Sequence, residues 1–256
     1  MSNINIVGRR LEGKTTLAMY LAKRKYKARV AWDPRCMLRG VLIYNVDDLQ
    51  LAIDQREWEK DTLIYRPISG EVNTEFHEFC GVLFPPHFTY GGFALVVDEA
   101  GELQNAHGIN PDLVRIVKQH PTSPPEQGVM IIQTNHRLAE FNNSCKALLD
   151  ELYIFQTTLP GDLDTLEKHT GLAEVTPIVR TLPKHHCVRY LYGRQDVGVE
   201  QYEVWDNPEM WKPVGVISVP DESSSTVIFD SPEEEEEQYY GRPEGVESSR
   251  ATGGRQ

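Results

Sequence analysis

The chain has 256 residues, of which 40% are hydrophobic, and a formal net charge of -12. This length fits one large α/β domain, alone or with an appendage. No run of residues approaches the roughly 18 apolar positions of a transmembrane helix, and Met1-Ser2-Asn3 does not begin a secretory signal peptide, so we expect neither a membrane span nor secretion. Four scattered cysteines without a C-x-x-C pair indicate neither a zinc site nor a disulfide framework.

The negative charge is concentrated at the carboxyl end. Residues 220–256 hold ten acidic residues against three arginines, whereas residues 1–219 hold 28 acidic against 23 basic residues. The tail is also rich in Ser, Gly and Pro, so we predict a folded domain over residues 1–219 and a disordered acidic tail over residues 220–256. Basic residues crowd the first forty positions, which favours either contact with phosphates or a solvated end of the first helix.

The first motif follows a short apolar run at residues 4–7. The segment GRRLEGKT matches G-x-x-x-x-G-K-[ST], and a helical pattern follows it in TTLAMYLAKRK. This is the strand, loop and helix order of a phosphate-binding loop, whose backbone N–H groups, lysine and hydroxyl contact phosphates and Mg²⁺. We therefore predict that ATP or GTP binds here. The expected contacts are Gly8, Arg9, Arg10, Leu11, Glu12, Gly13, Lys14, Thr15 and Thr16.

Beyond this loop, strand patterns alternate with helical patterns up to about residue 171. We expect the remaining strands at 28–32, 62–66, 93–100, 128–137 and 151–156. We expect helices at 15–25, 45–60, 70–84, 111–120, 137–149 and 159–171. This alternation is typical of an α/β fold with a parallel, doubly wound sheet. Two later strand patterns, within 185–205, predict a β-hairpin that adds an antiparallel pair at the sheet edge.

Two adjacent acidic residues, Asp98 and Glu99, end the apolar run FALVV. Carboxylates at the end of a buried strand are costly without partners. Beside a phosphate loop, the aspartate can hold the Mg²⁺ shell and the glutamate can orient and deprotonate water. We predict Thr15 and Asp98 as Mg²⁺ ligands, Lys14 as the contact to the β/γ-phosphates and Glu99 as the base. The pair favours hydrolysis, because a small-molecule kinase has less use for a carboxylate aimed at water.

A polar cluster, Gln133, Thr134 and Asn135, ends the next apolar run. In a parallel sheet this end lies on the same side as the phosphate loop. A carboxamide here can contact the γ-phosphate or the attacking water, and we favour Asn135 over Gln133 for that sensor role. A polar exit from a strand into a loop is the plainer alternative. Asp33 also has two interpretations, contact with the nucleotide or capping of the turn before Pro34.

In this order, GRRLEGKT, LVVDEA, MIIQTNHR and DELYIFQTTLPGDLDTL resemble the FtsK-HerA superfamily of P-loop ATPases. More closely, they resemble the branch that includes viral genome-packaging ATPases and zonular-occludens-toxin-like (Zot) phage assembly proteins, over roughly residues 3–172. The resemblance implies a P-loop NTPase fold of the additional-strand, catalytic-glutamate type, with the Asp98 strand between the phosphate-loop strand and its other neighbours.

The resemblance also implies function. Members usually form a homo-oligomeric ring, most often a hexamer, that moves double-stranded DNA through its centre with ATP bound between subunits. Capsid or portal-vertex proteins are then expected partners, and the host cytoplasm or the virion is the expected location. An arginine usually reaches the neighbour's γ-phosphate. Arg115 and Arg137 are the candidates here, although an ordinary surface role fits each equally well.

The leading hypothesis is an ATP-hydrolysing motor that translocates DNA during viral or phage genome packaging. A Zot-like assembly or secretion ATPase is one alternative, which the lack of a membrane segment disfavours. A second alternative is a switch or scaffold that binds ATP and moves nothing. A third, a small-molecule kinase, predicts a phosphorylated product in place of free phosphate.

Overall fold

The computed structural model describes residues 3–84, 92–105, 107–119, 128–139, 141–171, 173–192, 198–203 and 212–218. The tail predicted over residues 220–256 lies outside these ranges, as do residues 120–127 of the proline-rich segment. The described strands are β1 (Asn3–Val7), β2 (Ala28–Trp32), β3 (Val41–Ile43), β4 (Leu63–Tyr65), β5 (Phe93–Val97), β6 (Val129–Asn135), β7 (Glu151–Phe155), β8 (His186–Leu191), β9 (Gly198–Glu203) and β10 (Lys212–Ser218).

Helices connect most of these strands. The described helices are α1 (Lys14–Lys25), α2 (Val46–Asp54), η1 (Glu57–Glu59), α3 (Val72–Leu83), η2 (Ala100–Glu102), α4 (Pro111–Gln119), α5 (Asn143–Lys146), α6 (Pro160–Thr170) and α7 (Val175–Thr181). Within the part of the chain that the structure describes, no helix is long and apolar enough to cross a membrane.

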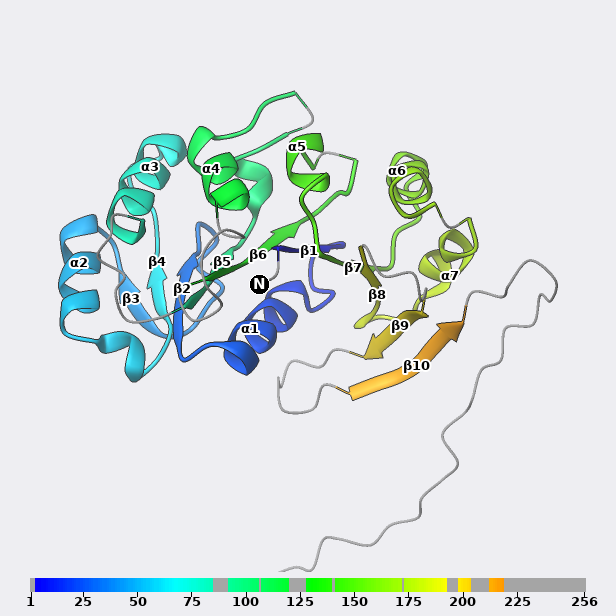
Figure 1. Cartoon of the computed structure of the whole chain (residues 1–256), viewed down its shortest axis with the longest axis horizontal. Helices are drawn as coiled ribbons and strands as arrows, with labels where there is room; N and C mark the ends of the chain where they lie inside the picture. The colour runs from blue at the N-terminus through cyan, green and yellow to red at the C-terminus, as the bar shows by residue number, and fades with distance from the viewer. Residues whose placement is uncertain are drawn as a thin grey trace, which may run out of the picture.

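All described strands belong to one sheet, in the order β10-β9-β8-β7-β1-β6-β5-β2-β4-β3 (Figure 1). Strands β1 to β7 pair in parallel, and β8, β9 and β10 extend the β7 side as antiparallel strands. The predicted α/β fold with a mostly parallel sheet and a late hairpin is confirmed. Strand β6 lies between β1 and β5, so the Asp98 strand does not adjoin the phosphate-loop strand; β6 is the additional strand between them.

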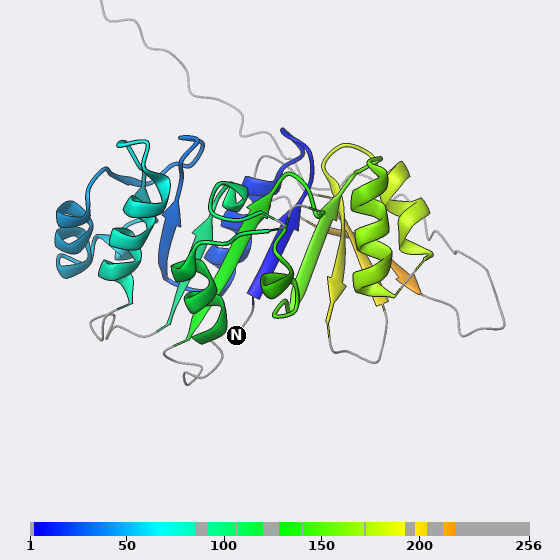
Figure 2. The same cartoon turned by 90° about the horizontal axis from the view of Figure 1, so that it is seen from above.

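Two apolar cores lie on the two faces of the sheet. Helix α1 covers one face, and α3, α4 and α6 cover the other, which faces the viewer in Figure 2. Alternate positions of the parallel strands therefore enter different cores. Ala94 and Val96 of β5, and Met130 and Ile132 of β6, pack with α1, whereas Leu95 belongs to the larger core on the opposite face.

Some sequence predictions of local structure were wrong. The helix expected over 137–149 is reduced to α5, because the Asn142 side chain accepts a hydrogen bond from Ser144 N and starts the helix there. The helix expected over 45–60 is broken at Arg56, whose φ of 57° is left-handed. The short strand β3, helix α7 and strand β10 were not predicted.

Candidate active site

The phosphate loop joins β1 to α1 and leaves the start of α1 open. Gly8 N donates to Asn135 O at 3.2 Å, and a Cβ at Gly8 would lie 2.5 Å from Cβ of Phe155, so only glycine fits there. Gly13 has a φ of 100° and caps α1 without any side-chain hydrogen bond. The first N–H groups of α1 therefore remain available to an anion, which the helix dipole also favours.

Lys14 is held as a buried cation inside this loop. Its Nζ donates to Arg9 O at 2.9 Å and lies 3.4 Å from Nδ1 of His136. Burial lowers the pKa of Lys14, and the carboxylates of Glu99, Asp98 and Glu12 oppose that shift. The ammonium thus lies close to three acids, at a site where it can also bind a phosphate oxygen.

Asp98 is the centre of a buried hydrogen-bond network. Thr15 Oγ1 donates to Asp98 Oδ1 at 3.1 Å, and Thr134 Oγ1 donates to the same oxygen at 2.7 Å. Burial raises the pKa of Asp98, while the bonds from Thr134 and Thr15 lower it. Thr134 Oγ1 also accepts from Glu99 N at 3.0 Å. One threonine therefore orients both acidic residues.

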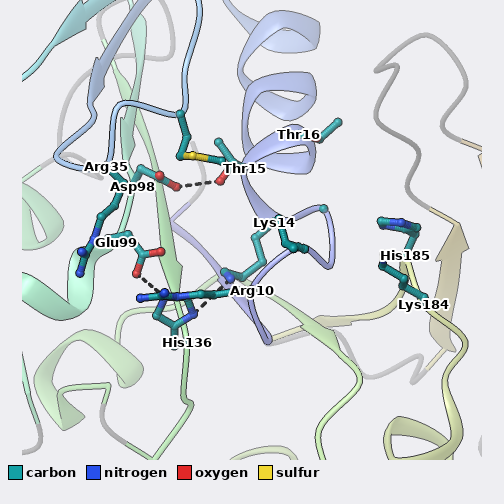
Figure 3. A pocket seen from close by; sticks show the side chains of 13 residues that line it. Arg10, Lys14, Thr15, Thr16, Arg35, Asp98, Glu99, His136, Lys184 and His185 are labelled. Carbon is teal, nitrogen blue, oxygen red and sulfur yellow. Dashed lines mark hydrogen bonds and ion pairs between the residues drawn. The ribbon is translucent and has the colours of Figure 1, made fainter.

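Glu99 projects its carboxylate into the cavity from an unusual backbone conformation. Its φ of 52° lies in the left-handed region, which costs a non-glycine residue about 1–3 kcal/mol unless its surroundings fix it. Here the N–H donates to Thr134, and the carbonyl accepts from Glu102 N at 2.9 Å. The carboxylate Oε2 lies 2.8 Å from Nε2 of His136 (Figure 3).

These groups line a cavity of about 620 Å³. Arg35, Asp98, Glu99 and His136 lie on one side of it, with the phosphate loop between them and Lys184 and His185 on the other side (Figure 3). A volume of this size lies within the usual range for small-molecule sites, roughly 300–1,000 Å³. The cavity thus presents cations and an open helix terminus to one ligand.

The structure brings most of the predicted residues together. The predicted residues that line the cavity are Arg10, Leu11, Gly13, Lys14, Thr15, Thr16, Asp98 and Glu99. The Arg9 guanidinium turns away to donate to Thr158 Oγ1, and the Glu12 carboxylate accepts from His185 N at 3.3 Å. Their roles in nucleotide binding stay predictions.

The predicted sensor and arginines do not line the cavity. Asn135 is buried, and its Nδ2 donates to Asn5 Oδ1 at 2.7 Å. Arg115 pairs with Asp112 at 3.1 Å within α4, and Arg137 Nε lies 3.8 Å from Asp162 Oδ2. Within one chain none of these three side chains is at the phosphate loop. A sensor role for Asn135, and a role for either arginine in a neighbouring subunit, stay predictions.

Sequence reasoning gave no role to several residues that the structure brings to the site. His136 lines the cavity, and Thr134 bonds Asp98 and Glu99 N–H. Both share the strand face of Ile132, because side chains alternate along β6, so this alternation predicts their direction. Lys184 and His185 precede β8 and line the cavity. His185 N donates to Glu12 of the phosphate loop across 173 positions of sequence, for which no local pattern exists. For Asp33 the structure shows the capping interpretation: its carboxylate accepts from Met37 N and Leu38 N.

No family model matches the chain, and no curated protein matches it. Solved structures do match. The genome packaging NTPase B204 from Sulfolobus turreted icosahedral virus 2, in complex with AMPPCP, superposes with a TM-score of 0.62 at 18% identity, over 77% of this chain and 96% of that one. The chain has the fold of a viral genome-packaging NTPase.

Two further solved structures match the chain. B204 of Sulfolobus turreted icosahedral virus, described as a DNA-packaging ATPase, gives a TM-score of 0.57 at 16% identity, over 74% of this chain and 92% of that one. The N-terminal domain of zonular occludens toxin from Neisseria meningitidis gives a TM-score of only 0.39 at 13% identity, over 84% of this chain and 95% of that one.

Proposed function

We propose that the chain hydrolyses ATP and uses the energy to move double-stranded DNA into a viral or phage particle. The observation that carries the first half is the convergence of Lys14, the Thr15–Asp98 pair and Glu99 on one cavity at the open start of α1. A base, a cation and an anion-binding helix terminus are the parts that phosphoanhydride hydrolysis requires.

The residues present fit a magnesium ion. Among the described residues no three His, Cys, Asp or Glu side chains gather as a metal site, so protein ligands would be few. That suits Mg²⁺, which is usually held by one or two protein oxygens, with water and phosphate oxygens completing its shell. Thr15 Oγ1 and Asp98 Oδ1, which are 3.1 Å apart, are the oxygens that would hold it. When bound, Mg²⁺ neutralises charge on the β- and γ-phosphates.

The chain's own groups then divide the work. The N–H groups at the start of α1 bind phosphate oxygens, and the Lys14 ammonium binds the β/γ oxygens. Glu99 Oε1 and Oε2 orient the attacking water and accept its proton. Thr134 orients the two acidic residues for their separate roles. Its hydroxyl donates to Asp98 Oδ1, and the oxygen of the same hydroxyl accepts from Glu99 N–H.

The DNA half of the proposal draws support from the fold shared with packaging NTPases and from exposed basic residues. Lys23, Arg24 and Lys25 form the exposed last turn of α1. Such a cluster can contact phosphates, although as the solvated end of a helix it also has a purely structural explanation. A homo-oligomeric ring, capsid or portal-vertex partners, and a place in the host cytoplasm or virion belong to the same proposal.

Phosphate release by the full chain with Mg²⁺ and ATP tests the proposal. We expect free phosphate, a higher rate with double-stranded DNA, and loss of that stimulation as salt rises. Hydrolysis that no nucleic acid stimulates would favour the switch or scaffold. A phosphorylated small molecule would favour the kinase, and no turnover of ATP under any condition would contradict the proposal. The sedimentation coefficient of the protein with and without ATP would show whether it assembles into a ring.

A further inference from the structure

His136 lies between the phosphate-binding lysine and the proposed base. His136 directly follows Asn135, the last residue of β6, and its ring lines the cavity (Figure 3). Nδ1 lies 3.4 Å from Lys14 Nζ, and Nε2 lies 2.8 Å from Glu99 Oε2. The side chain is 31% exposed, so it is fixed on one side and open to a ligand on the other. One imidazole thus contacts both residues that would act on the γ-phosphate.

The chemistry of these neighbours determines the ring's tautomer. An ammonium carries only donors, so Nδ1 of His136 must accept from Lys14. A neutral imidazole that accepts at Nδ1 carries its hydrogen at Nε2, the atom that faces the Glu99 carboxylate. Nε2 makes no hydrogen bond of ordinary geometry to the described residues, so the short contact with Glu99 is electrostatic rather than strictly directional.

The contact between Lys14 and His136 is compatible with phosphate binding in this geometry. An ammonium has three N–H donors, and in the described structure two of them are directed at Arg9 O and His136 Nδ1. The third donor is available for a phosphate oxygen. Lys14 can therefore bind phosphate while it still fixes the ring, and the ring can still fix Glu99.

We propose that His136 is a positioning residue for ATP hydrolysis: it holds the Glu99 carboxylate toward the phosphate site, with its own ring orientation set by Lys14. In this role no proton moves through the imidazole of His136. The ring keeps its protonation state while Glu99 accepts the proton of water. The inference rests on the proposed ATPase function and adds to it the residue that aims the base.

Three substitutions separate positioning from general structural support. His136→Gln places an amide N–H near the Nε2 position, His136→Asn places its end group near Nδ1, and His136→Ala removes both. We expect kcat to fall about 10–100-fold in the Ala and Asn variants. This loss is smaller than the roughly 10²–10⁴-fold rate enhancement that a positioned base contributes, because Glu99 itself is still present. We expect Gln to restore kcat to within about threefold of wild type, because Glu99 regains its neighbour. ATP affinity should change by less than about twofold in all three.

A matched control and a spectroscopic measurement complete the test. His107 is exposed and outside the cavity, so His107→Ala should leave kcat and the thermal unfolding temperature unchanged. Nitrogen NMR of ¹⁵N-histidine protein without nucleotide should show a neutral His136 ring protonated at Nε2, and Lys14→Ala should shift the tautomer ratio because Nδ1 loses its donor.

The outcomes distinguish this inference from the proposed function. If wild type is active and the Ala variant has a kcat within twofold of it, the positioning role of His136 is overturned and the proposed ATPase function stands. A wild-type ring protonated at Nδ1 would have the same consequence. Equal losses in Gln, Asn and Ala, with lower thermal stability, would show a structural role and overturn positioning. Inactive wild type would overturn both proposals.

Discussion

The two ends of the cavity are built differently. At the end formed by β5 and β6, hydrogen bonds through Thr134 fix Asp98 and Glu99, and Asp98 and Thr134 are buried while Glu99 is half-buried. At the other end, Lys184 is exposed and His185 is half-buried. The first arrangement suits a reaction, since preorganised polar groups act without reorganisation, whereas the second suits binding that tolerates motion. We therefore expect substitutions at the two ends to affect different kinetic constants.

The largest expected effect lies between the two ends, at Lys14. Lys14→Ala removes a buried cation that faces three carboxylates, so both ATP binding and turnover should fall, with kcat/KM lower by about 10²–10³-fold. Steady-state phosphate release measures this. The matched control is Lys168→Ala on the exposed surface of α6, and an equal loss there would show that the effect is not specific to the site.

At the β5–β6 end, Thr134→Val should lower kcat more than ATP affinity. Valine keeps the shape of threonine but leaves Glu99 N–H without its acceptor and removes one hydrogen bond from Asp98. We expect a loss of about 1–3 kcal/mol in the free energy of unfolding and about tenfold in kcat. Denaturant melts and kinetics check both. Thr165→Val, on α6, should cost little, because its hydroxyl only bonds Gly161 O at the surface.

At the outer end, Lys184→Ala should raise KM several-fold and change kcat by less than about twofold. The side chain is exposed, so its attraction for phosphate is screened and is worth at most about 1 kcal/mol. Titration with a slowly hydrolysed ATP analogue, at low and high salt, measures the affinity. A kcat loss as large as that of Thr134→Val would erase the proposed difference between the two ends.

The smallest expected effect is on stability, at Asp98 in metal-free protein. Burial raises the pKa of Asp98 above its ordinary value of 3.8, so the folded state binds the proton more tightly than the unfolded state. The cost of the buried charge is absent below pH 3.8 and grows as pH rises through the folded-state pKa. Asp98→Asn should therefore melt at a higher temperature than wild type at pH 7 in EDTA.

That gain from Asp98→Asn should shrink as pH falls toward 3.8, because both proteins are then neutral at position 98. Melting temperatures across this pH range check the sign. A gain that does not change with pH would mean that Asp98 is not charged at a cost in the folded state, and that the β5–β6 end is less constrained than its hydrogen bonds indicate.

The two ends also differ in how well the sequence predicts them. Gly8, Gly13, Lys14 and Thr15 follow one strand and begin one helix, so a local pattern is enough to identify them. Asp98 was predicted from its place after a buried strand. His136 directly follows Asn135, so finding it requires the alternation along β6 to be followed past the end of the strand. The sensor role of Asn135 stays a prediction.

The outer end could not be predicted for a physical reason. Lys184 and His185 reach the cavity because β8 pairs with β7, which in turn pairs with β1. That order of strands is a property of the whole sheet and leaves no trace near residue 184. The position of β6 between β1 and β5 has the same origin, and hydrophobic patterns alone do not encode it.

The central claim is that Glu99 activates water at a site that Lys14, Thr15 and Asp98 prepare. The most direct test gives full-length wild type and Glu99→Gln γ-labelled ATP with Mg²⁺, and follows bound ATP and free phosphate in the same sample. Because glutamine cannot take the proton, we expect the variant to bind ATP with affinity within about threefold of wild type and to release phosphate about 10²–10⁴-fold more slowly. Wild-type turnover in Glu99→Gln would contradict the account.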